Sequence, residues 1–381
     1  MITDSQQDTN LDISCVNPRI VRANTTQVTS RFSTKHPLLA LVISHTGTSE
    51  IPGITVAGAN PELVKRTPAA DSEFLYYGHC KCIDSVPATP DGKPTPAIIT
   101  RGALSSAKIP LLVIDAGAQV KPSIPFISFG LEPGKNILHH DAMDRPQVEK
   151  AFSYGVQLGR QLAFAVDLLV IGESIPAGTT TALATLSALG IDAKFKVSSS
   201  MPENPHELKN NIVTNAMQRS GISFGQLKDD PIGAVSALGD PMIPTVAGIA
   251  VGAIDSGTRV LLAGGTQMCT VLAILKSFGR DLNKICIGTT SYLASDATSN
   301  IAGLLSSISN DVPILAANLH LAESSKAGLQ AFAKGFVKDG AGAGGSSIAA
   351  MLKSNGEIDG RVLLSAIEKE YELSIEKNVR K

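Results

Sequence analysis

Short runs of hydrophobic residues recur along the 381-residue chain, and most of them end in Gly, Ser, Thr or an acidic residue before an amphipathic stretch begins. Runs that are apolar throughout, without alternation, are typical of strands buried on both faces of a parallel sheet. The pattern therefore predicts strands at 38–44, 110–117, 166–173, 193–199, 259–265, 284–290 and 312–318.

Apolar residues recur with a helical period between these strands. The period predicts helices at 147–164, 180–189, 207–219, 267–278 and 320–336. Gly190 and Gly279 stand where a glycine commonly ends a helix. Alternating strands and helices predict an α/β fold with an open, Rossmann-like parallel sheet flanked by helices. Ligands of such sheets bind at the carboxyl ends of the strands, so the loops that follow the strands are the places to search.

The two ends of the chain differ from this alternating middle. Residues 1–36 are polar and rich in Thr and Ser, and we interpret them as an arm or an extra edge element. Residues 37–343 form the expected α/β domain. Residues 344–381 have a helical pattern, and we expect them to pack with the N-terminal segment in a small, mainly helical subdomain. The stretch 43–75, which contains His45 and Asp71, is expected to be rich in loops.

Composition excludes several classes of protein. The 33 basic and 34 acidic residues give a net charge of -1, so no overall field attracts nucleic acid or an anionic membrane. No apolar run reaches the roughly 18 residues that span a bilayer. The N-terminal residues lack the basic start and apolar core of a secretory signal, so we expect a cytoplasmic protein.

The cysteines give no sign of a metal site or of a disulfide framework. They are five in number and scattered, at Cys15, Cys80, Cys82, Cys269 and Cys286. The closest pair forms CxC and not the CxxC of zinc sites, and no second pair follows. We expect reduced thiols and no bound metal.

The segment 166–190 carries the strongest functional signal. The strand VDLLVIG leads into Glu173, then SIPAG, then three threonines that begin with Thr179 and Thr180, then an Ala/Leu-rich helix. A helix N-terminus offers unpaired N–H donors and a partial positive charge, which favour a phosphate, and Gly178 would allow its close approach. The segment lacks the Lys of a P-loop. An ordinary helix capped by threonine is the structural alternative.

Two later glycine-rich stretches have the same character. RVLLAGGTQM places Gly264 and Gly265 after a strand, with Thr266 expected to cap the next helix, and a purely structural turn is an equal alternative. KDGAGAGG contains Gly340 and Gly342 in a literal GxGxxG. A helix and not a strand precedes it, so a nicotinamide-dinucleotide oxidoreductase is a weak hypothesis.

The residues of 166–190 also resemble a known family. VDLLVIGESIPAGTTTALATLSALG is similar to the signature of the nicotinate-nucleotide:dimethylbenzimidazole phosphoribosyltransferases. The resemblance extends from about residue 110 to about residue 355, through LLVIDAGA, HELKNNI and the late glycine loop, while the N-terminal block resembles a divergent branch. It implies a parallel α/β sheet with a small subdomain, a homodimer and no metal or redox cofactor.

The activity that the resemblance implies is the transfer of phosphoribose from nicotinate mononucleotide to a benzimidazole, which makes the α-riboside phosphate of the cobalamin lower ligand. Glu173, Gly178, Thr179 and Thr180 would face the mononucleotide, and the two threonines would grip its 5′-phosphate together with Lys209. The other substrate contacts expected are Asp115, Gly264, Gly265, Thr266, Gly340 and Gly342.

The late glycine loop departs from the family. A Gly-Glu-Gly there carries the proposed general base, whereas this chain has Gly340-Ala341-Gly342, and the usual Gly-Asn before the threonines is Ala177-Gly178. Displacement at the anomeric carbon builds positive charge and requires a carboxylate, so we expect Asp339 or Glu173, with Asp115 third, to serve. The alternatives are a different acceptor such as a purine base, or a non-catalytic nucleotide binder acting as a sensor or carrier.

Overall fold

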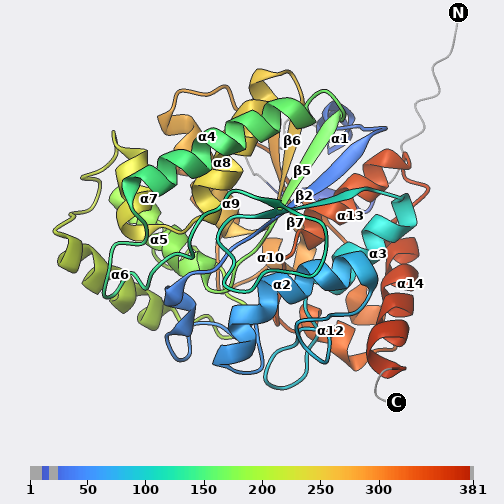
Figure 1. Cartoon of the computed structure of the whole chain (residues 1–381). Coiled ribbons are helices and arrows are strands. Elements are labelled where there is room, and N and C mark those ends of the chain that lie inside the picture. The colour runs from blue at the N-terminus through green and yellow to red at the C-terminus, as the bar shows by residue number, and fades with distance from the viewer. Residues whose placement is uncertain (1–10, 17–24, 378–381) are drawn as a thin grey trace, which may run out of the picture.

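The computed structural model describes residues 11–16 and 25–377 as an eight-stranded sheet with helices on both faces (Figure 1). The strands lie in the order β1-β8-β7-β6-β5-β2-β3-β4, and all pairs are parallel except β1 with β8. Their bounds are β1 Ile13–Cys15, β2 Pro37–Ile43, β3 Leu111–Asp115, β4 Ile127–Ser128, β5 Leu168–Ser174, β6 Arg259–Ala263, β7 Ile285–Thr290 and β8 Ile314–Ala317. The α/β fold predicted from the sequence is confirmed.

The helices fill the connections between strands. The longer ones are α2 Pro61–Tyr77, α3 Ala97–Ala107, α4 Arg145–Leu162, α5 Gly178–Ala188, α6 His206–Ser220, α8 Met242–Asp255, α9 Thr266–Ser277, α13 Ala343–Lys353 and α14 Gly360–Tyr371. The shorter ones are α1 Thr25–Arg31, α7 Pro231–Leu238, α10 Ser291–Ala294, α11 Ile301–Ser306 and α12 Ala327–Ala333, with the 3-10 turns η1 Gly47–Glu50 and η2 Leu321–Glu323 and the π-helical turn η3 Glu372–Glu376. None of the helices in the described part of the chain is long and apolar enough to cross a bilayer.

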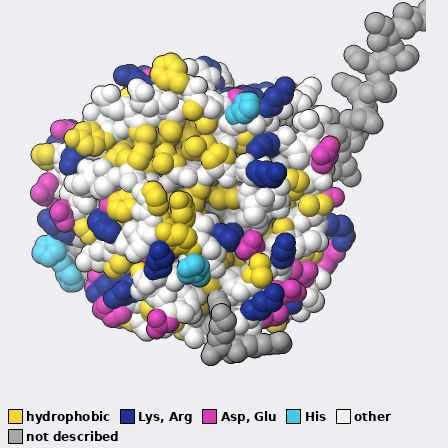
Figure 2. All heavy atoms as spheres, turned by 45° about the vertical axis from the view of Figure 1, so that its right-hand side comes forward, with side chains coloured by type: hydrophobic (Ala, Val, Ile, Leu, Met, Phe, Trp, Pro, Cys, Tyr) yellow, Lys and Arg dark blue, Asp and Glu magenta, His cyan; other side chains and the backbone are white. Residues whose placement is uncertain are grey.

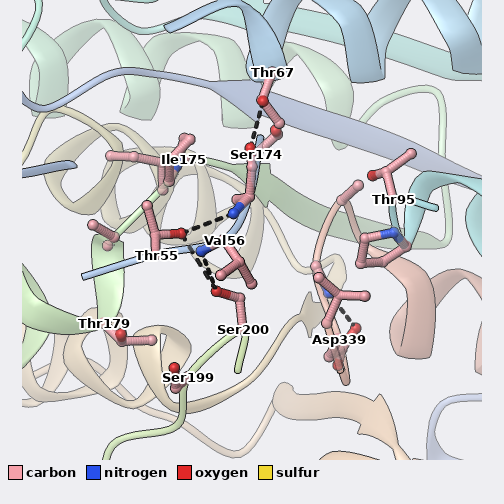
Figure 3. A pocket seen from close by; sticks show the side chains of 18 of the residues that line it. Thr55, Val56, Thr67, Thr95, Ser174, Ile175, Thr179, Ser199, Ser200 and Asp339 are labelled. Carbon is pink, nitrogen blue, oxygen red and sulfur yellow. Dashed lines mark hydrogen bonds between the residues drawn. The ribbon is translucent and has the colours of Figure 1, made fainter. Parts of the chain in front are cut away.

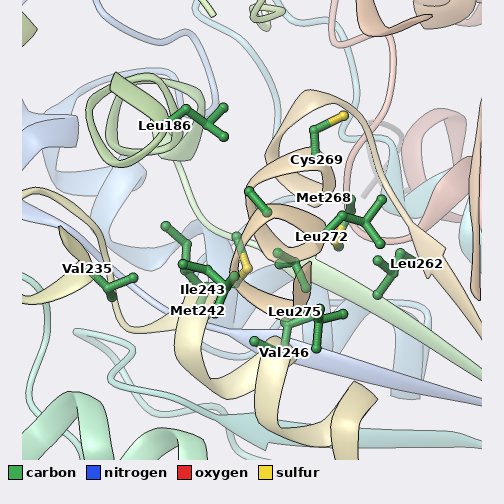
Figure 4. Close-up of a cluster of buried hydrophobic side chains, with 14 of the residues drawn as sticks. Leu186, Val235, Met242, Ile243, Val246, Leu262, Met268, Cys269, Leu272 and Leu275 are labelled. Carbon is green, nitrogen blue, oxygen red and sulfur yellow. The ribbon is translucent and has the colours of Figure 1, made fainter. Parts of the chain in front are cut away.

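The sheet separates two hydrophobic cores because successive side chains of a strand point to opposite faces. Leu169 and Ile171 of β5 join the core under α4, α5, α7, α8 and α9, whereas Leu168 and Val170 join the core under α3, α13 and α14. Figure 4 shows the first core, where side chains of α5, α7, α8 and α9 meet Leu262 of β6. Helices α4 and α8 run side by side over it, and a Cβ at Gly159 would lie only 2.1 Å from the carbonyl oxygen of Ile249.

The surface carries both signs of charge, as the net charge predicts. Figure 2 shows Lys, Arg, Asp and Glu side chains interspersed over one face, with a group of hydrophobic side chains in its upper part. This mixed pattern offers no broad field of one sign on the face shown.

Several predicted elements are wrong in detail. Residues 193–199 form turns and not a strand, since Phe195 has left-handed backbone (φ 60°) while only Ala193 and Val197 of the apolar residues reach the core. The helix expected at 320–336 is broken into η2 and α12, with His320 at φ 51°.

The stretch 43–75 contains more helix than its loop-rich pattern predicted. Helix α2 begins there, with Pro61 in its first turn and the side chain of Asn60 accepting a hydrogen bond from the backbone N–H of Leu63 (3.0 Å). The N-terminal arm lies partly outside the described residues, and its described part supplies the edge strand β1.

Candidate functional site

A cavity opens at the carboxyl end of β5, next to the turns that follow β6 and β7 (Figure 3). The empty space within it, with the open solvent at its mouth included, is about 920 Å³. Its walls come from parts of the chain that are far apart in sequence: residues within 54–57, 87–96, 173–179, 198–200 and 337–341, two residues of α2, the β6–α9 turn and Leu293. The cavity lies at the edge of the sheet where the sequence analysis expected a ligand.

The N-terminus of helix α5 forms one end of the cavity and carries no side-chain cap. Ala177 precedes the helix in a left-handed conformation (φ 60°), so the structural alternative of a helix capped by threonine is wrong. Thr179 lines the cavity. Thr180 does not: its Oγ1 is buried and has no hydrogen-bond partner among the described residues. The Thr181 hydroxyl donates a hydrogen bond to Oδ2 of Asp240 (2.5 Å).

The N-terminus of helix α9 lies beside that of α5 and is also open. Gly265 precedes the helix without a side-chain cap, so the expected role of Thr266 as the cap is wrong. The Thr266 hydroxyl instead accepts a hydrogen bond from the backbone N–H of Ser198 (2.9 Å). A Cβ at Gly178 would lie 2.6 Å from Nε2 of Gln267, which shows how closely the two helix starts approach.

Residues Ser198–Ser200, here named the serine loop, form the wall next to these helix starts. Lys209 is fully buried behind the loop and does not line the cavity: its Nζ donates to the carbonyl oxygen of Ser198 (2.5 Å) and to Oδ1 of Asn204 (3.0 Å). Burial, reinforced by the charge of Lys338, lowers the pKa of Lys209 to about 7. The ammonium group therefore supports the loop and leaves the cavity to the hydroxyls.

Lys338 contacts the backbone directly after the serine loop. Its Nζ donates to the carbonyl oxygen of Met201 (3.0 Å) and lies 3.3 Å from a carboxylate oxygen of Asp296. Burial lowers the pKa of Lys338, against the opposing effect of Asp296. Two buried lysines and one buried aspartate thus fix the backbone next to the serine loop.

Glu173 occupies the carboxyl end of β5, and it lines the cavity although its side chain is 6% exposed. Burial raises its pKa well above the usual range, and the nearby carboxylate of Asp339 adds to the effect. The backbone N–H of Ile175 is the donor that opposes this shift. A carboxyl group with a raised pKa is a stronger base than an exposed one, and this group faces the cavity.

Asp339 also lines the cavity, but its oxygens are occupied. One accepts hydrogen bonds from the Thr289 hydroxyl (2.5 Å) and the backbone N–H of Thr290 (3.3 Å), and the other accepts from the backbone N–H groups of Gly340 (2.8 Å) and Gly344 (3.2 Å). Burial raises its pKa. Its four contacts fix the loop between α12 and α13.

Three further residues expected at the site lie outside the cavity lining. Asp115 is fully buried at the end of β3, where it accepts from the backbone N–H of Ala118 (2.8 Å) and pairs with Lys121 (2.7 Å). Gly264 lies behind Glu173, since a Cβ there would be 3.6 Å from its Oε1. Gly342 has φ 78° and directly precedes α13, whereas Gly265 and Gly340 line the cavity.

Helix α2 contributes a part of the site that no sequence motif predicts. Asp71 lines the cavity and accepts hydrogen bonds from the hydroxyls of Thr95 (2.7 Å) and Ser174 (2.7 Å). Burial raises its pKa to about 6 against the effect of the two hydroxyls. Asp71 was recognised only as a polar residue in a loop-rich stretch, and no local pattern connects it to Ser174. No group of three or more His, Cys, Asp or Glu side chains in the described ranges is arranged to hold a metal ion.

The chain is similar in sequence to a known family and to several known proteins. A family model described as "Phosphoribosyltransferase" matches residues 103–332. The UPF0284 protein of Sulfurisphaera tokodaii is 48% identical over 328 residues, which cover 85% of this chain and 91% of the relative. The UPF0284 protein of Archaeoglobus fulgidus is 48% identical over 332 residues, which cover 87% and 92%.

Two solved structures from Thermus thermophilus share the fold. One is described as nicotinate-nucleotide-dimethylbenzimidazole phosphoribosyltransferase (TM-score 0.58) and the other as CobT (TM-score 0.60); each is 17% identical and matched over 92% of both chains. At this identity the likeness shows the fold alone. Together with the family model and the relatives, it places the chain in the phosphoribosyltransferase family related to CobT, in the divergent branch of the UPF0284 proteins.

Proposed function

We propose that this protein transfers phosphoribose from nicotinate mononucleotide to an aromatic nitrogen base, a benzimidazole or a purine, to make an α-riboside phosphate. The observation that carries the proposal is the buried carboxyl of Glu173, which faces a cavity bounded by two uncapped helix N-termini. Family membership supports phosphoribosyl transfer, and the geometry of the cavity supports the roles given below.

The 5′-phosphate binds at the paired starts of α5 and α9. Both helix ends lack a side-chain cap, so their unpaired N–H groups and partial positive charge favour a phosphate dianion. The hydroxyls of Thr179 and of the serine loop lie on the same side of the cavity and supply further donors (Figure 3). Lys209 acts from behind the serine loop as a positioning residue, because its Nζ is held by Ser198 and Asn204.

Glu173 serves as the general base. A ring nitrogen of the acceptor attacks C1′, the bond between C1′ and the pyridine nitrogen breaks, and its electron pair leaves with nicotinate. The second ring nitrogen then releases its proton to the Glu173 carboxylate, whose negative charge also stabilises the positive charge that builds on the sugar. The raised pKa makes this carboxylate a stronger base than an exposed one.

The acceptor base lies against the apolar part of the cavity. Ile175, Pro96, Val337 and Ala341 supply this surface near Glu173. Such walls exclude water from a reaction in which water would compete as the nucleophile. Holding donor and acceptor in line supplies much of the remaining rate enhancement.

The test is the release of nicotinate from nicotinate mononucleotide in the presence of a panel of benzimidazoles and purines, followed by liquid chromatography. We expect release that depends on the added base and is lost in Glu173→Gln. Glu132→Gln, which removes an exposed carboxylate outside the cavity lining, is the matched control and retains activity. Base-independent release or no release with any base would reject the transfer.

A non-catalytic binder of the same nucleotide is the second candidate. Ala341 lines the cavity at the position where the resemblance implies a glutamate, so a base expected from the family is absent. This candidate predicts calorimetric binding of nicotinate mononucleotide without turnover. Turnover that Glu173→Gln abolishes would exclude it.

A further inference from the structure

Gln267 is a buried amide in the cavity wall that the proposed chemistry does not use. It is the second residue of α9, lines the cavity and is 7% exposed. Its Oε1 is buried and has no hydrogen-bond donor among the residues that the structure describes. A buried acceptor without a donor destabilises a fold, and a donor on a ligand in the cavity would remove that cost.

The backbone around Gln267 places its amide group next to the start of α5. Gly178, the first residue of α5, leaves room for the amide: a Cβ there would lie 2.6 Å from Nε2 and 3.0 Å from Cδ. The neighbouring Thr266 is held by the backbone N–H of Ser198. The amide therefore lies across the seam between the two helix starts, where the phosphate is proposed to bind.

The same turn connects Gln267 to the proposed general base. Gly264 stands three residues earlier, and a Cβ at that position would lie 3.6 Å from Oε1 of Glu173. The β6–α9 turn thus borders Glu173 at one end and the start of α5 at the other. A group bound along this turn lies between the phosphate site and the reacting carbon.

We propose that Gln267 accepts a hydrogen bond from a ribose hydroxyl of the bound nucleotide and selects ribose over deoxyribose. The inference rests on the proposed function for the identity of the nucleotide. At neutral pH the phosphate dianion, the ring carboxylate and the pyridinium ring of nicotinate mononucleotide have no N–H or O–H group, so the two ribose hydroxyls are its hydrogen-bond donors. The hydroxyl edge of the sugar then faces the α5–α9 seam.

This contact explains selectivity better than it explains affinity. A site built to accept a hydroxyl hydrogen rejects the analogue that lacks it, because the buried acceptor is again left unpaired. Fixing the sugar through a hydroxyl also sets the orientation of C1′ toward the side of the cavity that holds Glu173. Gln267 is therefore a specificity residue and not a catalytic one.

Calorimetric binding without an acceptor base tests the inference separately from turnover. Nicotinate mononucleotide is compared with its 2′-deoxy and 3′-deoxy analogues, and ribose 5-phosphate with 2-deoxyribose 5-phosphate. For the unaltered protein we expect the loss of one of the two hydroxyls to raise Kd by about tenfold or more. Gln267→Glu keeps an acceptor oxygen and keeps the preference, although its charge beside the phosphate weakens the binding of all sugar phosphates alike. Gln267→Met is similar in size but accepts no such bond, so it binds ribose and deoxyribose forms within about twofold.

Thermal melting of each variant shows whether it folds, and Gln267→Glu keeps the test valid if Gln267→Met does not. Equal binding of all sugar forms by the unaltered protein would overturn the inference, as would loss of the preference in Gln267→Glu. If the preference is present but nicotinate is never released to an acceptor, the transfer fails and the role of Gln267 stands.

Discussion

The two sides of the cavity bury opposite charges in opposite ways. On the side of Glu173 and Asp71, carboxyl groups line the cavity and burial raises their pKa values. On the side of the serine loop, Lys209 and Lys338 are buried behind the wall, bonded to backbone carbonyls, and burial lowers their pKa values. Under the proposed function, the carboxyl side would take a proton, while the buried lysines would fix the backbone beside the bound anion.

Replacing the central carboxyl should have the largest effect. Glu173→Gln keeps the size of the side chain but removes the base, so we expect kcat for nicotinate release to fall by about 10²–10⁴-fold with a smaller change in KM. Steady-state kinetics beside the Glu132→Gln control measures this. An unchanged kcat would show that Glu173 is not the base, and the proposed contrast between the two sides of the cavity would fail.

The pH dependence of activity tests the raised pKa of Glu173. A general base must be deprotonated, so activity should be low at acid pH and rise as pH passes through the raised pKa of Glu173. The acid limb should therefore lie at higher pH than the usual range of a glutamate. A profile that is already flat from pH 5 upward would contradict a raised pKa at the base.

A buried carboxyl just behind the cavity should change stability with pH. Burial raises the pKa of Asp240 from 3.8 to about 6, so the folded state holds this proton more tightly than the unfolded state. The resulting stability is present below about pH 4 and is lost as pH rises through about 6, an effect of about 3 kcal/mol. Asp240→Asn keeps its acceptor for the N–H groups of Met242 and Ile243 and should remove this fall.

Urea unfolding at several pH values measures the effect as the difference between the unaltered protein and Asp240→Asn. Asp229→Asn, at an exposed carboxylate, is the control and should leave the dependence unchanged. A fall in stability between pH 4 and 6.5 that is the same in all three proteins would show that Asp240 is not the titrating group.

Removing the buried ammonium should act on binding more than on chemistry. Lys209→Met leaves the carbonyl of Ser198 and Oδ1 of Asn204 without this donor, and we expect a loss of about 1–3 kcal/mol of stability. The loosened serine loop should raise KM for the nucleotide while kcat changes little. Lys228→Met, at an exposed lysine, is the control, and a fall in kcat at constant KM would place Lys209 in the chemistry instead.

Two adjacent threonines offer the smallest and most closely matched comparison. Thr179 lines the cavity, whereas the Thr180 hydroxyl is buried and unpaired within the described structure. Thr179→Val should weaken nucleotide binding severalfold, consistent with the loss of one hydrogen bond of about 1 kcal/mol. Thr180→Val should leave binding unchanged and should not lower the melting temperature. Equal effects of the two changes on Kd would contradict the placement of the phosphate.

The sequence predicts the fold where burial leaves a clear hydrophobic pattern. The central strands are apolar on both faces, so β2, β5, β6 and β7 could be found, whereas β4 has only two residues and leaves no pattern. The strand predicted at 193–199 fails because Phe195 adopts left-handed backbone, which hydrophobicity does not encode. The division into domains and the homodimer stay predictions.

The site was predictable only in part, for a similar reason. Glu173 and Thr179 follow a strand directly, so a local motif identifies them. Asp71 reaches the cavity from α2 and meets Ser174 only after folding, and Lys209 turns its charge away from the cavity toward Ser198. Contacts of this kind depend on tertiary packing, which a resemblance of motifs does not convey.

The most direct test of phosphoribosyl transfer follows the reacting carbon itself. Nicotinate mononucleotide labelled with ¹³C at C1′ is incubated with the protein and an aromatic base, and the reaction is observed by NMR. We expect a new C1′ resonance coupled to a nitrogen of the acceptor and in the α configuration, absent with Glu173→Gln. A label that stays in nicotinate mononucleotide, or that appears only in ribose 5-phosphate, would contradict the account.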